Sequence, residues 1–188
     1  MIKRIGFCCQ WFHHDQTLKK KQLEELQRPF NTRSTTVRWL NEHKQEAEDK
    51  LQFVFHHNIQ AIKNLITKVG NLPAERRMCR ISSPILPVAT QIDWKYYWDK
   101  PDVISYCEKH VKISFHPGQF TVLASETPDI VERSIEEFEY HASMARMMGF
   151  GKSFQDGCKI NVHISGRQGP EGIRKALPRL SPEARNLI

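Results

Sequence analysis

Four short apolar runs are spaced along this chain, and longer segments of a different periodicity separate them. The runs cover Ile2–Cys9, Arg77–Ser83, Val111–His116 and Cys158–Ile164. Their lengths and alternating apolar positions are typical of buried β-strands. The last two runs share one design, because each is an alternating strand that stops at a histidine and is followed by a turn.

The segments between these runs carry apolar residues at three- and four-residue spacing, which is typical of amphipathic helices. The longest such segment extends from about Asn41 to Val69. The next begins with Thr127 as the N-cap and Pro128 in the first helical position. Its expected buried stripe is Val131, Ile135, Phe138, Ala142 and Ala145. His141 is expected to lie off this stripe and to be incidental.

The predicted order of elements is β-α-β-α-β-α-β-α, with shorter helices ending at Arg28, covering Pro101–Lys109 and running from Gly172 to about Leu180. Strand–helix–strand units of this kind form parallel sheets, and four of them make half of an eight-stranded barrel. We therefore expect a single domain over residues 1–188. A half barrel exposes two sheet edges, so we favour an excerpt of a longer protein. Pairing with another half, or a smaller open sheet, are the alternatives.

This arrangement makes two histidines the first candidate functional site. Parallel strands end at the same edge of a sheet, and α/β proteins build their sites at that edge. His116 and His163 are therefore expected to lie close together there. Neutral imidazole is the commonest metal ligand, so the pair predicts a divalent metal centre. The alternative is that each histidine only packs or hydrogen-bonds at its strand end.

The amino-acid composition indicates which class of partner the protein binds and in which cellular compartment it is expected. The formal charge of +7 favours a polyanionic partner, nucleic acid first. The five cysteines include no C-x-x-C pair, which is typical of a reduced, cytosolic protein without a disulfide framework or zinc ribbon. No apolar stretch is long enough to span a membrane and no signal peptide is evident, so the expected location is cytoplasmic.

The segment His116-Pro-Gly-Gln-Phe120, with Val131-Glu-Arg-Ser134 on the next helix, resembles the UV damage endonuclease family. Cys79-Arg-Ile-Ser-Ser-Pro-Ile-Leu-Pro87 is similar to the second strand of that family, and Val162-His-Ile-Ser-Gly166 is similar to its fourth. The resemblance implies a TIM-barrel-type fold like that of endonuclease IV, of which about four of eight βα units are present. It reaches from the first residue to the last but only about halfway through the barrel of the family.

The resemblance also implies an activity and roles for particular residues. The family implied is a DNA repair enzyme that cuts 5′ to UV photoproducts with a cluster of divalent metals, typically Mn²⁺, with Mg²⁺, Zn²⁺ and Co²⁺ as other options. His116 and His163 match metal ligands of the family, and damaged double-stranded DNA is the implied partner, with no obligate protein partner. Gln119 and Phe120 match a pair that probes the lesion. Pro117-Gly118 would turn the chain so that both project outward, and all four residues belong to the expected DNA-binding loop.

This sequence departs from the family pattern in three ways. Gln91 stands where the family usually has a further histidine ligand, and glutamine is a weak ligand for such metals. Phe7 replaces a common tyrosine, which removes a hydroxyl. No Asp or Glu ends a predicted strand at the proposed edge, although hard divalent ions need carboxylates.

Two other functions remain open from the sequence. A metal-dependent sugar isomerase or epimerase on a similar barrel would show a small closed pocket and no preference for damaged DNA. A truncated chain that binds DNA or a partner without cutting it would lack the carboxylates of a complete metal site. The exposed-aromatic motif and the positive charge favour the endonuclease over the isomerase.

Overall fold

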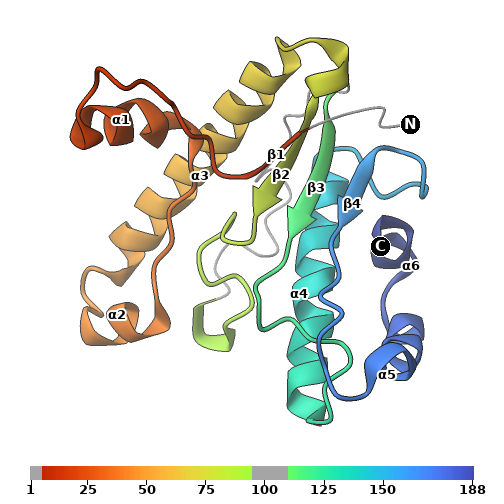
Figure 1. The fold of residues 1–188 in the computed structure, drawn as a ribbon. Helices are drawn as coiled ribbons and strands as arrows, with labels where there is room; N and C mark the ends of the chain where they lie inside the picture. Colours follow the sequence, from red (N-terminus) through yellow and green to blue (C-terminus); the bar gives the residue numbers. More distant parts are fainter. Residues whose placement is uncertain (1–5, 95–109) are drawn as a thin grey trace.

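The computed structural model describes residues 6–94 and 110–188 (Figure 1). The beginning of the strand predicted from Ile2 lies outside the described residues. The same holds for the helix predicted at Pro101–Lys109 and for the neighbouring aromatic residues Tyr96, Tyr97 and Trp98.

A parallel β-sheet forms the centre of the described structure. Its strands are β1 (Phe7–Cys9), β2 (Met78–Ser82), β3 (Lys112–His116) and β4 (Cys158–Ile160), and they lie side by side in chain order. Each neighbouring pair is parallel. The alternation of β-strands with helices therefore produces the α/β architecture that the hydrophobic pattern predicts.

One face of the sheet is buried and the other is half-buried. Cys79, Ile113 and Cys158 share one row across the strands, and Ile81, Phe115 and Ile160 share the next; all six are at most 3% exposed. Because side chains alternate along a strand, the residues between them point to the opposite face. His116 belongs to that second face, in one row with Ser82.

Two long helices pack against the sheet (Figure 1): α3 (Ala47–Gly70) and α4 (Pro128–Met147). Helix α4 begins where the sequence predicts, although the side chain of Thr127 makes no capping hydrogen bond. The single helix predicted from Asn41 is wrong at its start, because the chain forms α2 (Val37–Glu42) and then leaves the helical path before α3. The hydroxyl of Thr36 accepts a hydrogen bond from Trp39 N–H and so starts α2 independently.

The remaining elements of the described residues are short helices. They are α1 (Lys20–Gln27), the 3-10 turns η1 (Arg28–Phe30), η2 (Ala74–Arg76), η3 (Ile92–Trp94) and η4 (Leu177–Arg179), and the C-terminal α5 (Gly169–Ala176) and α6 (Pro182–Leu187). Among the helices of residues 6–94 and 110–188, none is both long enough and apolar enough to cross a membrane.

Strand β4 is shorter than the sequence predicts. It ends at Ile160 rather than Ile164, and the last backbone hydrogen bond to its neighbour runs from Asn161 N–H to the carbonyl of Phe115. The neighbouring strand β3 stops at His116 because Pro117 has no N–H to offer a ladder. The chain beyond Asn161 therefore has no parallel strand beside it, and His163 lies in the loop after the strand.

Asn58 joins α3 to two loops. Its side chain is fully buried; the amide oxygen accepts from Arg33 N–H at 2.7 Å, and the amide nitrogen donates to the carbonyls of Arg33, Pro84 and Ile85. A single polar residue within an otherwise apolar helix face thus fixes the segment that follows β2.

We expect Asn58→Ala to lower the free energy of unfolding by about 2–4 kcal/mol, because it leaves several buried backbone groups without partners. Urea denaturation measures the change. Gln60→Ala is the matched control, since Gln60 is exposed and its side chain donates a hydrogen bond to Asn64 in the next turn of the same helix. Equal stability of the two variants would contradict the role given to Asn58.

Candidate functional site

The ends of β3 and β4 bring two histidines together. His116 is the last residue of β3, and His163 lies three residues beyond the end of β4. Their ring centroids are 5.3 Å apart, with the planes inclined at 39°. The structure therefore places the two imidazoles side by side at the carboxyl edge of the sheet, as the strand pattern predicts.

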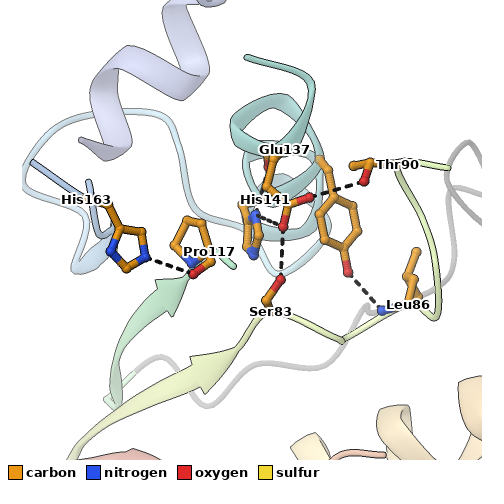
Figure 2. A network of polar contacts seen from close by, with 8 residues as sticks. Ser83, Leu86, Thr90, Pro117, Glu137, His141 and His163 are labelled. Atoms are coloured by element: carbon orange, nitrogen blue, oxygen red, sulfur yellow. Dashed lines mark hydrogen bonds and ion pairs between the residues drawn. The ribbon is translucent and has the colours of Figure 1, made fainter. Parts of the chain in front are cut away.

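Each imidazole of this pair has one nitrogen engaged. His116 Nδ1 lies 3.4 Å from Cys9 Sγ. His163 Nε2 lies 3.2 Å from the carbonyl oxygen of Pro117 (Figure 2). Since a carbonyl only accepts, His163 Nε2 carries the proton and Nδ1 keeps its lone pair. Within the described residues, no hydrogen bond engages His163 Nδ1 or His116 Nε2. These two nitrogens are the candidate donors to a cation.

The surroundings favour the neutral form of His116. Partial burial lowers the pKa of His116, and the nearby Arg80 and His163 lower it further. Neutral imidazole is the form that binds metal ions, so the pair is chemically suited to hold one. Arg80, by contrast, adds a positive charge near the place where a cation would bind.

The histidine pair fits part of a metal site rather than a whole one. No group of three or more His, Cys, Asp or Glu side chains arranged for a metal ion occurs among residues 6–94 and 110–188. A tetrahedral zinc site has four ligands, and harder divalent ions take six or more, with carboxylate oxygens among them. The missing ligands are therefore not supplied by the part of the chain that the structure describes.

The loop after β3 presents its aromatic residue to solvent. Pro117 is buried, Gly118 is half-buried, and Gln119 and Phe120 are exposed. A turn closed by Thr121 N–H and the carbonyl of Gly118 carries the two exposed side chains outward. Phe120 is 82% exposed, so a burial of this ring below the loop is ruled out. The ring of Phe120 is therefore open to contact with another molecule.

A cavity of about 850 Å³ lies beside this loop. Phe120, Arg133, Glu137 and Arg167 belong to its lining, as does Gln91. Neither histidine of the pair is among the lining residues. Gln91 is exposed on this cavity and shares it with a carboxylate rather than with the imidazoles.

Helix α4 anchors the segment that follows β2 (Figure 2). The carboxylate of Glu137 accepts hydrogen bonds from Ser83 Oγ at 2.9 Å and Thr90 Oγ1 at 3.3 Å. One turn further, Tyr140 Oη accepts from Leu86 N–H at 2.8 Å. Complete burial raises the pKa of Tyr140, so its phenol stays neutral. These three hydrogen bonds fix the segment that follows β2.

His141 belongs to the same anchoring region and is not incidental. It is 0% exposed, it packs at 5.6 Å from the ring of Phe115, and its Nδ1 lies 2.7 Å from the carbonyl of Glu137. The prediction that it lies off the buried stripe is therefore wrong. The sequence spacing does indicate that His141 is buried, since it follows the buried Phe138 by three positions and so shares its face of the helix.

A comparison with known families identifies the chain. The model of the family described as UV-endonuclease UvdE matches residues 4–187. The chain belongs to this family. It is 30% identical over 161 residues to a protein named UV DNA damage endonuclease from Bacillus mycoides (strain KBAB4), covering 81% of this chain and 48% of that protein. A protein of the same name from Bacillus cereus (strain B4264) is 31% identical over 152 residues, covering 77% and 45%.

A solved structure of the UvdE type shares the fold. The crystal structure titled SacUVDE superposes with a TM-score of 0.67 at 24% identity, covering 98% of this chain and 59% of that chain. The chain thus spans about half the length of the curated relatives it matches. Among the residues that carry the UvdE resemblance, the structure gathers His116 and His163 and exposes Gln119 and Phe120; it leaves Gln91 on the neighbouring cavity.

Buried His141 predicts a pH-dependent stability. Burial lowers the pKa of His141 in the folded state, whereas an unfolded histidine titrates near 6.5. Below about pH 6.5 the unfolded chain takes up a proton that the folded chain refuses. The free energy of unfolding should therefore fall by up to about 1.4 kcal/mol per pH unit on account of this residue.

Urea denaturation between pH 7.5 and pH 5 is the measurement. His141→Gln should flatten the dependence of unfolding free energy on pH, because the titrating group is gone. His56→Gln, at an exposed position of α3, is the matched histidine-to-glutamine control. An unchanged slope in His141→Gln would contradict the assignment.

Proposed function

We propose that the whole protein is a metal-dependent DNA repair endonuclease that nicks damaged double-stranded DNA on the 5′ side of UV photoproducts. The observation that carries the proposal is the juxtaposition of His116 and His163 beside an exposed Phe120, in a chain of the UvdE family. The names of its relatives, UV DNA damage endonuclease, support the same activity. A cytoplasmic location stays a prediction.

In this proposal the described sheet is half of a TIM-type barrel. The parallel order β1-β2-β3-β4 supports this, because consecutive strands are neighbours in such barrels. His116 and His163 would hold one of the divalent ions, with Mn²⁺ first and Mg²⁺, Zn²⁺ or Co²⁺ as alternatives. Bound metal ions would supply Lewis-acid stabilisation of the phosphate and a water of lowered pKa. The carboxylates would come from residues outside those described.

The loop residues have a separate role in this proposal. Phe120 would stack on an exposed base or fill the gap in a distorted duplex, and Gln119 would offer donors and acceptors to base edges. Pro117 and Gly118 would shape this DNA-binding loop, and the carbonyl oxygen of Pro117 also holds His163. The net charge of +7 supports electrostatic attraction to the DNA backbone.

We expect His116→Ala and His163→Ala to reduce Mn²⁺-dependent nicking of UV-irradiated plasmid by more than about 100-fold. The reason is that even outer partners of metal ligands commonly contribute 10- to 100-fold to affinity or activity. The conversion of supercoiled to nicked plasmid on a gel is the measurement. His56→Ala is the matched control, because this exposed histidine of α3 lies outside the pair.

Two results would overturn the endonuclease proposal. Full nicking by both variants would remove the histidines from the site. Damage-selective binding by the parent protein without metal-dependent cleavage would favour the non-catalytic DNA-binding function instead. The described residues contain no group of three side chains arranged for a metal ion. This observation favours non-catalytic DNA binding as the second candidate function.

Phe120→Ala should weaken binding to UV-damaged duplex by about 5- to 150-fold, since stacking of one base on an aromatic ring contributes about 1–3 kcal/mol. Phe120→Tyr should bind nearly as tightly as the parent protein. Phe154→Ala serves as control, because this exposed phenylalanine lies in the loop before β4, at the opposite end of the strand. Fluorescence anisotropy with damaged and undamaged duplexes measures the affinities, and equal losses on both would contradict a lesion-probing role.

A further inference from the structure

Cys9 makes an unexpected contact across the sheet. Its Sγ lies 3.4 Å from His116 Nδ1, although β2 separates β1 from β3. Two inter-strand spacings amount to about 9.6 Å between backbones, so both side chains have to lean toward one another at the edge of the sheet. Within the described residues this is the hydrogen bond that His116 makes.

Regular strand geometry would not produce this contact. Cys9 is in register with Ile81, whose side chain is buried on the helix-covered face, whereas His116 is in register with Ser82 on the other face. Cys9 adopts a φ of +64°, which is uncommon for a residue with a side chain. This backbone turn interrupts the alternation of β1 at its last residue. Sγ consequently reaches the face that carries His116.

The contact has a chemical consequence for the metal-binding nitrogen. A neutral imidazole carries one proton, and which nitrogen holds it depends on the partner of the other. When Nδ1–H donates to sulfur, the lone pair stays on Nε2, the nitrogen without a partner among the described residues. When the thiol instead donates to Nδ1, the imidazole proton occupies Nε2 and blocks coordination there. Ligating histidines generally donate their other N–H to an acceptor in the protein.

We infer that Cys9 is a positioning residue: its sulfur accepts Nδ1–H of His116, fixes the ring and keeps the lone pair on Nε2 for a divalent cation. The inference rests on the proposed function, because it assigns His116 to a metal. It adds a residue from β1 to a site otherwise built by β3 and the loop after β4. Cys9 acts through His116 and does not itself touch the metal.

The first test needs no metal. Nitrogen-15 NMR of the metal-free protein at neutral pH reports which ring nitrogen of His116 is protonated, with His116→Asn used to assign the signal. We expect the Nδ1–H form in the parent protein. Cys9→Ala should shift His116 toward the Nε2–H form, which neutral histidine favours in water. A parent protein that already shows the Nε2–H form would overturn the inference, whether or not the variant folds.

The second test measures Mn²⁺ affinity of the intact protein by calorimetry. Cys9→Ala should raise the dissociation constant by about 10- to 100-fold, the usual effect of losing the outer partner of a ligating histidine. Cys9→Ser keeps an acceptor and should bind closer to the parent protein than to Cys9→Ala. Both substitutions keep a Cβ, so the cost of the positive φ is the same in each.

The possible outcomes separate this inference from the proposed function. If the parent protein binds Mn²⁺ and His116→Ala does not, while Cys9→Ala binds as tightly as the parent, only the role of Cys9 fails. If the parent binds no divalent ion, the metal-dependent function fails with it. A thiolate-to-metal charge-transfer band after Co²⁺ loading would make Cys9 a direct ligand and would overturn its role as a positioning residue.

Discussion

The parallel pairing of β3 with β4 is the constraint on which the candidate site depends. The register of Ile113 with Cys158 and of Phe115 with Ile160 fixes how far each strand reaches toward the common edge. These residues are buried against the helices, and a slip by one residue would turn them to the other face. Burial of a few apolar side chains therefore determines where His116 lies and from where the chain to His163 departs.

Helix α4 in turn fixes the loops that follow β2 and β3. Three of its polar side chains hold backbone or hydroxyl groups that follow two different strands: Glu137 holds Ser83 and Thr90, Tyr140 holds Leu86, and Ser134 Oγ accepts from Val122 N–H. One face of a single helix thus orders the segments after β2 and β3. The exposed Gln119 and Phe120 project from a loop whose two ends are fixed, as the proposed contact with DNA in one geometry would require.

The sequence predicts the strands well where burial dictates alternation, and less well where tertiary contacts decide. β2 and β3 are found within a residue of their expected bounds, because each places alternate residues in the core. The end of β4 is missed because it depends on Pro117, the residue that ends the neighbouring strand β3. The prediction for His141 is wrong because histidine is a polar residue, whereas its helical spacing places it on the buried face. The turn at Cys9 leaves no local pattern, since its φ and its contact with His116 arise only in the assembled sheet.

The charges around the histidine pair indicate which part of a metal centre these residues could supply and which part they could not. Burial lowers the pKa of His116, and Arg80 lowers it further by repelling the protonated form. The same repulsion acts on any cation bound there. Two neutral nitrogens do not offset a divalent charge, whereas carboxylates do. No described carboxylate joins the pair in a metal-binding group, and Glu137 is engaged by two hydroxyls beside the neighbouring cavity. In the proposed function, the described βα units would contribute oriented nitrogen donors and an exposed loop that meets DNA, and the negative charge that balances a bound metal would come from other residues.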